Sequence, residues 1–113
     1  MSAKSNIQLK AEIRRLDDED PVEAPRGNHK HFKLIGIGFS QDMVVYISKN
    51  SDGSDKVDVE VVRDDSATST DKVWPAVAKP ALGVDPTDSK KPLWVAIKRN
   101  DQFENAYQGF IVI

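Results

Sequence analysis

KVDVEVVR, residues 56–63, alternates apolar and charged side chains, and this stretch decides the class of fold. Val57, Val59 and Val61 fall on one side of an extended backbone, whereas Asp58 and Glu60 fall on the other side. A period of two is typical of a β-strand that buries one face and exposes the other. The pattern therefore predicts a half-buried strand in the middle of the chain.

Other segments indicate strands as well. Residues 32–39 are apolar on both alternating sets, which predicts a central strand covered on both faces. Gly36 and Gly38 within it indicate a bulge or a close approach of another backbone. Residues 73–77 could form a short strand, which Pro75 limits to a sheet edge or to an extended segment, because proline cannot donate to a ladder. We predict further strands over residues 7–14, 43–48, 93–98 and 109–113, with Trp94 in the core.

Polar, turn-rich segments separate these strands. Residues 49–55 predict a turn that joins residues 43–48 to residues 56–63 as a hairpin. Loops are predicted over residues 17–30, 64–71 and 100–108. Six or seven short strands with such turns indicate an all-β, two-layer antiparallel β-sandwich, jelly-roll-like, formed as one domain by residues 1–113. A small OB-type barrel is the alternative.

The composition excludes several classes of protein. The 113 residues are 39% hydrophobic and carry a net charge of −2, which predicts a packed core and no basic footprint for duplex DNA. With no cysteine, the chain forms no disulfide, thiol nucleophile or zinc–thiolate site. No apolar run is long enough to predict membrane insertion. No signal peptide is recognisable before Arg15, so we expect a cytoplasmic protein, with signal-less release as the alternative.

Motifs of catalysis are not found. There is no Gly-x-Ser-x-Gly elbow and no P-loop, and Gly36-Ile37-Gly38 is followed by Gln41 where a dinucleotide fingerprint requires glycine. The sequence therefore favours a non-enzymatic function. His29 and His31 share one side of an extended chain, which suits either a metal pair or two solvated imidazoles. We expect no tight structural metal and no cofactor.

Aromatic residues supply the candidates for ligand binding. Trp74 precedes Pro75 in an irregular stretch, where an indole either packs under a loop or stands exposed as a stacking platform. Residues 100–108 combine two aromatic rings with amides and carboxylates, which is usual in carbohydrate sites. The predicted ligand-binding residues are Trp74, Asn100, Asp101, Phe103, Asn105 and Tyr107.

Residues 93–113 resemble the last hairpin of small bacterial galactose-binding lectins that lack a signal peptide. In that family a strand ends in Asn-Asp, asparagine oxygens of the following loop bind calcium, and Gly-x-Phe-x-Val closes the sheet. The pattern is echoed by Asn100-Asp101, Asn105, Gly109, Phe110 and Val112. The resemblance covers about a fifth of the chain, with a shorter loop and one asparagine in place of a pair. It implies sugar recognition, with calcium as a candidate ion.

Three classes of function therefore compete. A carbohydrate-binding module would use Trp74 and residues 100–108. A structural or assembly subunit, of a virion or another particle, would use edge strands and the apolar run 110–113, from which we expect self-association. An OB-type single-strand nucleic-acid binder would need a basic groove beside aromatic rings. The candidate groove residues are Lys30, Lys33, Lys90, Lys91, Lys98 and Arg99.

Overall fold

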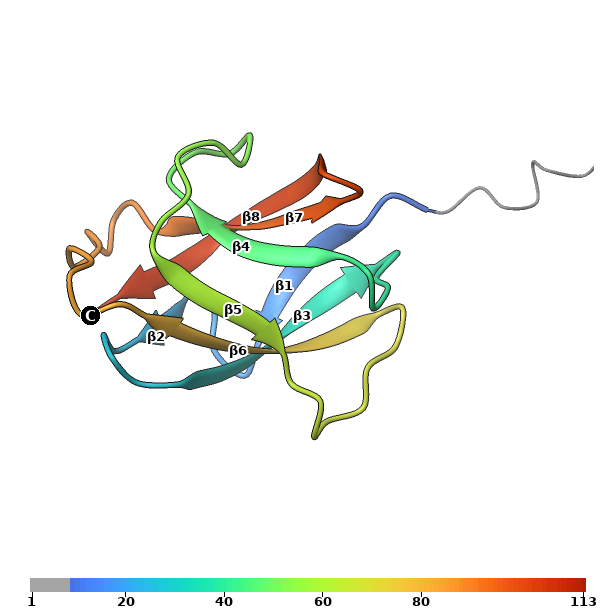
Figure 1. Cartoon of the computed structure of the whole chain (residues 1–113), viewed down its shortest axis with the longest axis horizontal. Coiled ribbons are helices and arrows are strands. Elements are labelled where there is room, and N and C mark those ends of the chain that lie inside the picture. Colours follow the sequence, from blue (N-terminus) through green and yellow to red (C-terminus); the bar gives the residue numbers. More distant parts are fainter. Residues whose placement is uncertain (1–8) are drawn as a thin grey trace, which may run out of the picture.

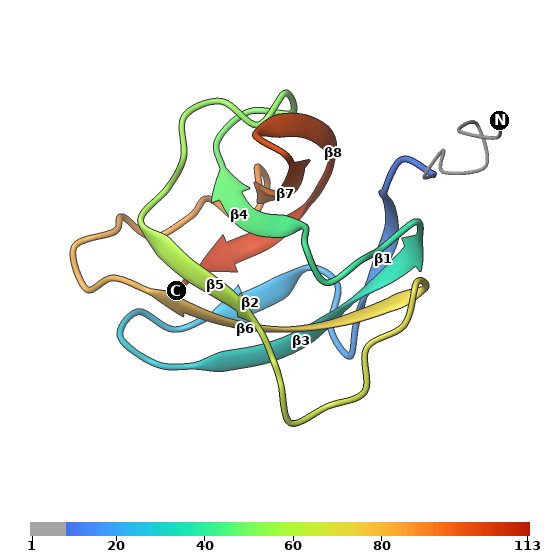
Figure 2. The same cartoon turned by 45° about the vertical axis from the view of Figure 1, so that its right-hand side comes forward.

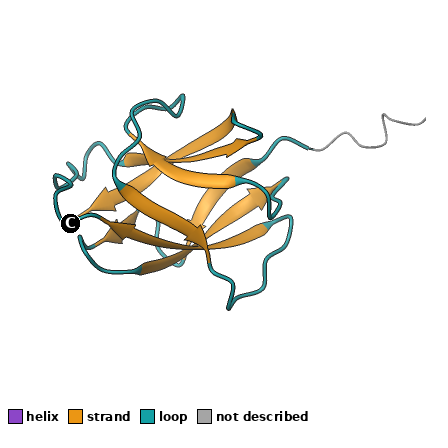
Figure 3. Cartoon of the chain, in the orientation of Figure 1, coloured by secondary structure: helices purple, strands orange, loops and turns teal. Residues whose placement is uncertain are grey.

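The computed structural model describes residues 9–113 as eight strands in two packed sheets, with no helix in this range (Figures 1 and 3). One sheet has the order β1 (Glu12–Asp17), β3 (Lys30–Ile37), β6 (Val73–Pro80) and β5 (Val59–Arg63). The other has the order β2 (Val22–Ala24), β8 (Gln102–Val112), β7 (Leu93–Arg99) and β4 (Val44–Ser48). The predicted all-β sandwich of two layers is confirmed.

The order of the strands specifies the type of sandwich. If β1, β3, β4, β5, β6, β7 and β8 are lettered A to G, the two sheets are A-B-E-D and C-F-G, which is the order of the immunoglobulin fold. The short β2 runs parallel to β8 and extends the second sheet, whereas the other pairs of the described strands are antiparallel. The turned view separates the two layers (Figure 2).

Alternating side chains of both sheets form the core. Leu34, Ile47, Ile97 and Phe110 are completely buried between the layers. The rings of Phe32 and Phe110 lie 6.0 Å apart between centroids with an interplanar angle of 57°, and so join the two sheets by a tilted contact. Full burial of each such side chain is worth about 1.5–3 kcal/mol, which makes this layer the main source of stability.

Gly36 in β3 and Gly38 just after it permit close contact with the N-terminal segment, as predicted. A Cβ on Gly36 would lie 1.9 Å from the backbone oxygen of Glu12 in β1. Gly38 has a φ of 75°, and a Cβ there would lie 2.6 Å from the backbone oxygen of Lys10. β1 itself has a register shift between Ile13 and Arg15 opposite this segment. β3 is central in its sheet, as predicted, since it lies between β1 and β6. The prediction that both of its faces are covered is wrong, because His31 and Lys33 are exposed on the face that points away from the core.

The predicted hairpin of residues 43–48 and 56–63 is wrong. β4 pairs with β7 in one sheet, whereas β5 pairs with β6 in the other. The connection between them crosses from layer to layer, and only an isolated bridge joins Ser48 to Lys56. Adjacency in sequence favoured a hairpin, but crossing lets β4 and β5 each bury an apolar face from opposite sides of the core.

The predicted edge position of the strand at Pro75 is also wrong. β6 lies inside its sheet, between β3 and β5. The carbonyl of Pro75 accepts from the amide of Asp64 at 3.0 Å, so the nitrogen of Pro75 also faces this side, where β5 has already ended at Arg63. The nitrogen of Pro75, which carries no hydrogen, therefore faces no residue of β5, and no hydrogen bond between β6 and β5 is lost.

The structure also changes the predictions for the two terminal parts of the chain. The N-terminal strand begins at Glu12 and extends to Asp17, and Ile7 of the predicted strand lies outside the described residues. The predicted loop 17–30 contains β2, whose three residues are too few for a period of two to be recognised in the sequence. At the other end, β8 contains the predicted strand of residues 109–113 up to Val112 and lies between β2 and β7.

The same arrangement removes the reason for which self-association was expected. Phe110, Ile111 and Val112 are all buried. The strand that carries them pairs with β2, and the amide of Val112 donates to Thr87 Oγ1 of the preceding loop at 2.9 Å. Within residues 110–113, only Ile113 is exposed. The apolar C-terminus is therefore part of the core and offers no free edge.

The predicted loop 100–108 is a turn followed by a strand. Arg99 pairs with Gln102, so Asn100 and Asp101 alone connect β7 to β8. Their φ values of 54° and 61° are those of a two-residue turn with two left-handed residues, for which Asn and Asp are well suited. The strand was missed because its first half is polar and binds polar groups of β1, as described below.

Candidate ligand-binding face

The predicted ligand-binding residues lie in different parts of the sandwich. Trp74 is 3% exposed and packs in the core, so its ring is not a platform for a ligand. Asn100 and Asp101 form the turn at one end of the second sheet. Phe103 lies on the outer surface of that sheet, whereas Asn105 and Tyr107 are turned towards the first sheet. The six residues therefore do not form one site.

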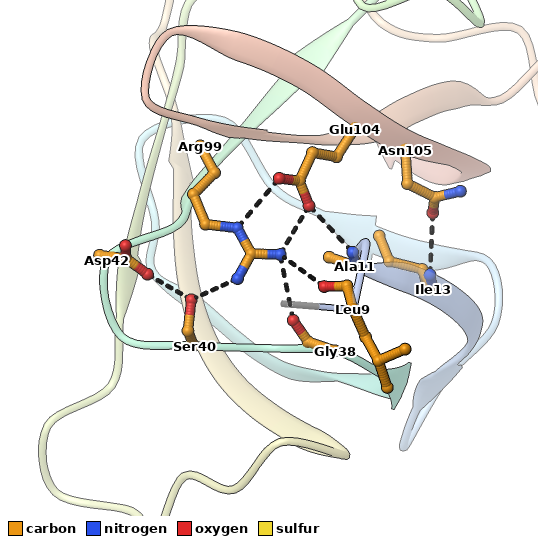
Figure 4. Close-up of polar contacts among 9 residues, drawn as sticks. All are labelled: Leu9, Ala11, Ile13, Gly38, Ser40, Asp42, Arg99, Glu104 and Asn105. Atoms are coloured by element: carbon orange, nitrogen blue, oxygen red, sulfur yellow. Dashed lines mark hydrogen bonds and ion pairs between the residues drawn. The ribbon is translucent and has the colours of Figure 1, made fainter. Parts of the chain in front are cut away.

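Residues of β8 close the free edge of the N-terminal strand. Asn105 Oδ1 accepts from the amide of Ile13 at 2.8 Å, and Glu104 Oε1 accepts from the amide of Ala11 at 2.9 Å (Figure 4). These backbone donors point away from β3 and have no ladder partner, so the side chains replace a missing strand. Asn105 and Glu104 thus join the two layers.

Arg99 forms the centre of the same polar cluster. Its guanidinium donates to both carboxylate oxygens of Glu104, at 3.0 Å from Nε and 2.6 Å from Nη2, and also to Ser40 Oγ and the backbone oxygens of Leu9 and Gly38 (Figure 4). Ser40 Oγ in turn donates to Asp42. The pKa of Glu104 is lowered, chiefly by the hydrogen bonds from Arg99. Arg99 is 4% exposed, so this charged pair holds strands together and offers no surface for a ligand.

Tyr107 completes the contact between the layers. Its hydroxyl donates to Asp20 Oδ2 at 2.6 Å, and the same oxygen accepts from the amide of Leu16 at 3.3 Å. The hydrogen bond to Asp20, together with burial, raises the pKa of Tyr107 to about 12. The calcium site implied by the lectin resemblance does not fit this arrangement. The loop that would hold the ion is a two-residue turn, and the oxygen of Asn105 is bound to β1.

Aromatic residues instead gather on the outer face of the second sheet. Four aromatic side chains of the described residues are not buried, and three of them, Tyr46, Trp94 and Phe103, lie on this face. The alternate residues Val45, Ile47 and Val95 point into the core, which fixes the outward direction of their neighbours. We call this surface the aromatic face and define it as Val44, Tyr46, Trp94, Ala96, Lys98, Phe103, Ala106 and Gln108. Trp94 is therefore half-buried on the outside, and the prediction that it lies in the core is wrong.

The aromatic face spans three strands and three rows, with an irregularity in β8 between the first and second rows and the buried Ser48 at one corner. The strand pairings align Val44, Lys98 and Phe103 in the first row. The second row holds Tyr46, Ala96 and Ala106, and the third holds Ser48, Trp94 and Gln108. The surrounding side chains cover the middle of the face, since Ala96 is completely buried. By strand geometry, Trp94 and Phe103 are two rows and one strand apart, roughly 14 Å.

The β4–β5 loop borders this face with polar groups. Tyr46 Oη donates to the backbone oxygen of Gly53 at 3.0 Å, and a Cβ on Gly53 would lie 2.6 Å from the ring of Phe103. The loop is shaped by its own bonds, since Asp52 Oδ1 accepts from the amide and the hydroxyl of Ser54. These Asx-type contacts are turn chemistry, as predicted, and they place an exposed carboxylate beside the rings.

One positive and one negative side chain lie beside the Tyr46 ring of the aromatic face. Lys98 Nζ lies 5.5 Å from the centroid of the Tyr46 ring, which is a cation–π contact. The pKa of Tyr46 is raised, first by burial and second by the negative charge of Asp52. The pKa of Asp52 is lowered by its hydrogen bonds from Ser54, so this side chain stays a carboxylate and an acceptor near neutral pH. The face thus offers apolar rings, one ammonium donor and one carboxylate acceptor.

Three other features of residues 9–113 lie wholly or mostly outside the aromatic face. His31 Nδ1 lies 3.3 Å from Asp64 Oδ2 with the imidazole exposed, and within residues 9–113 no three His, Asp or Glu side chains gather as a metal site. The six candidate basic residues for single-strand binding are dispersed: Lys30 pairs with Glu19 at 3.0 Å, and Arg99 is buried. A cleft of about 450 Å³ lies between the β4–β5 and β6–β7 loops, lined by apolar and oppositely charged residues with no aromatic ring.

Comparisons of the chain with protein-family models, with curated proteins and with solved structures find no significant match. In the described part of the chain, no helix of the length and apolar character that a membrane crossing requires is found.

Sequence reasoning found Phe103 and named Lys98 only as part of a basic groove, but it assigned Trp94 to the core and missed Tyr46. The signal for them was present in the period of the two strands. Tyr46 alternates with Val45 and Ile47, and Trp94 alternates with Val95, so each aromatic ring falls on the set opposite to the core valines and isoleucines. The pairing of β4 with β7, which brings these outward sets together, was not visible without the strand order.

Proposed function

We propose that this protein is a non-enzymatic binding module that recognises a carbohydrate on the aromatic face. The observation that carries this proposal is the distribution of the aromatic residues. Three of the four unburied rings of the described chain share one face of one sheet, although nothing in folding requires that they leave the core together. Large rings on a surface are costly unless they contact a partner.

The chemistry of the face supports a sugar as the ligand. A pyranose has an apolar C–H face that stacks on aromatic rings and a rim of hydroxyls that donate and accept hydrogen bonds. Tyr46, Trp94 and Phe103 supply the rings. The ammonium of Lys98, the amide of Gln108 and the carboxylate of Asp52 supply donors and acceptors around them. The spacing of the rings suits several linked sugar units better than one monosaccharide.

A glycan array of the purified protein tests the proposal, followed by titration calorimetry of the best oligosaccharide. Removing the ring in Trp94→Ala or Phe103→Ala should weaken binding by about tenfold or more, since loss of one stacked ring costs on the order of 1.4 kcal/mol. Tyr46→Phe keeps the ring and should retain most of the affinity. Val62→Ala, on the opposite sheet and 50% exposed, is the matched control and should bind as the wild type does.

The proposal is contradicted if no glycan binds, or if ring removal and the Val62 control have equal effects. Thermal unfolding of each variant distinguishes loss of the site from loss of the fold. Binding that depends on calcium would also contradict the account, because the aromatic face has no cluster of carboxylates to hold that ion.

A further inference from the structure

The cleft between the β4–β5 and β6–β7 loops has the size of a small-molecule site. Its volume is about 450 Å³, and such sites usually measure about 300–1,000 Å³. Val57, Val84 and Leu93 line the cleft and also pack in or against the hydrophobic core, so its floor is apolar. An apolar floor below a few polar groups is typical of a site that binds a small ligand.

Hydrogen bonds of the backbone hold both walls of the cleft in place. The amide of Ala81 donates to the carbonyl of Asp58 at 3.1 Å, which ties the start of the β6–β7 loop to the segment before β5. Further along this loop, the amide of Thr87 donates to the carbonyl of Val112 at 2.9 Å, and Thr87 Oγ1 accepts from the amide of Val112. On the other wall, the amide of Val57 donates to β4 at 2.8 Å. The cleft is therefore formed without a ligand.

The rim of the cleft carries equal numbers of positive and negative side chains. They are Lys49, Lys56, Lys91, Asp58, Asp85 and Asp88. Within residues 9–113, none of them takes part in an ion pair, although charges of the chain do pair elsewhere, as Lys30 does with Glu19 at 3.0 Å. The three ammonium groups and the three carboxylates thus remain available to a ligand as donors and acceptors.

We propose that the cleft binds a small ligand that carries an ammonium group and a carboxylate at the two ends of an apolar body, as an amino acid or a short peptide with free ends does. The carboxylate of the ligand pairs with the lysines, and its ammonium group pairs with the aspartates. The apolar body lies on Val57, Val84 and Leu93.

The charges of the cleft favour this class of ligand over others. A ligand with charges of one sign would meet three like charges as well as three opposite ones. A neutral sugar would leave both sets of charges unpaired, and no aromatic ring lines the cleft to stack on it. The cleft shares no residue with the aromatic face, so its ligand is distinct from the sugar proposed there.

The dipeptide leucyl-leucine is the probe for this site, added to the isotope-labelled protein up to about 10 mM while the backbone amide shifts are measured. The shifts should saturate and should be largest at Val57, Val84 and Leu93. N-acetyl-leucyl-leucine lacks the ammonium group, and leucyl-leucine amide lacks the carboxylate. Each should bind roughly 2- to 5-fold more weakly than the dipeptide, as expected for the loss of a solvent-exposed ion pair.

Two variants identify which end of the dipeptide each set of charges holds. The dipeptide and its amide should bind equally to the triple variant Lys49→Gln, Lys56→Gln, Lys91→Gln. The dipeptide and its N-acetyl form should bind equally to the triple variant Asp58→Asn, Asp85→Asn, Asp88→Asn. The matched controls, which lie at exposed residues outside the cleft and should bind as the wild type does, are Lys33→Gln and Glu23→Gln.

The proposal is overturned if the dipeptide causes no saturable shift, or if the largest shifts lie outside the cleft. Equal binding of the dipeptide and both blocked forms to the wild type also overturns it, because an apolar contact alone would then account for binding. So does an equal loss of affinity in the control variants. Thermal unfolding verifies that the substitutions keep the fold. The result does not depend on sugar binding, because no sugar is present in the titration.

Discussion

The guanidinium of Arg99 and the carboxylate of Glu104 form a bidentate ion pair across the β7–β8 hairpin, with both donor–acceptor distances at 3.0 Å or less. Glu104 is also the acceptor for the amide of Ala11, so one carboxylate links the hairpin to the N-terminal segment. Because Arg99 is almost fully buried, its charge depends chiefly on this counterion, and to a lesser extent on the charge of Asp42 and on a few backbone and hydroxyl oxygens.

Glu104→Gln should therefore destabilise the fold by about 2–4 kcal/mol near neutral pH, since it leaves a buried charge without its counterion. Urea unfolding measures this free energy, and Glu23→Gln, at an exposed carboxylate, is the control that should change it little. Arg99 lowers the pKa of Glu104 in the folded state, so this stabilisation is present above the ordinary glutamate pKa and is lost as the pH falls through the lowered value. The difference between wild type and variant should accordingly shrink below about pH 4, and a difference that grows in acid would contradict the assignment.

Tyr107 should titrate later than an ordinary tyrosine. The bond to Asp20 raises its pKa from 10.0 to about 12, so its stabilising effect is complete below pH 10 and is lost as the pH rises towards 12. Ultraviolet absorbance of tyrosinate measures this, and Asp20→Asn should move the late step back towards pH 10. The chain has two tyrosines, so Tyr107→Phe assigns the step by removing it. An unchanged titration in Tyr107→Phe would refute the assignment.

Gly36→Ala should destabilise the sandwich by about 3 kcal/mol or more, because the added Cβ would collide with the backbone of β1. The matched control is Gly83→Ala, where a Cβ would have no neighbour within 4 Å, and it should change the free energy of unfolding by less than about 0.5 kcal/mol. Chemical denaturation of both variants measures the contrast. Equal effects of the two substitutions would show that β1 does not pack against β3 as described.

The fold class was predictable from sequence because the period of two is a local property, visible in Val57, Val59 and Val61. The partners of the strands were not, because pairing depends on contacts between segments far apart in the chain. The polar first half of β8 resembled a loop, since Glu104 and Asn105 bind backbone donors of β1 that no local pattern reveals. Phe103 was found because residues 100–108 combine aromatic rings with amides and carboxylates. Tyr46 and Trp94 share one face only because β4 pairs with β7, which the sequence does not reveal.

The two tryptophans should differ in their access to solvent. Trp74 is 3% exposed, whereas Trp94 stands half-buried on the aromatic face. In Trp94→Phe, the remaining fluorescence of Trp74 should resist quenching by iodide, while the wild type should lose a substantial part of its emission. Strong quenching of Trp74 in the folded variant would place that ring at the surface and contradict the structure of the core.

The most direct test of the account is a map of backbone amide chemical shifts during titration with the oligosaccharide that binds best on the array. The account predicts that the largest changes lie in β4, β7, the first half of β8 and the β4–β5 loop, and that they vanish in Trp94→Ala. Changes centred instead on the cleft beside the β6–β7 loop, or on the β1-β3-β6-β5 sheet around His31, would contradict the assignment of the aromatic face as the ligand-binding site.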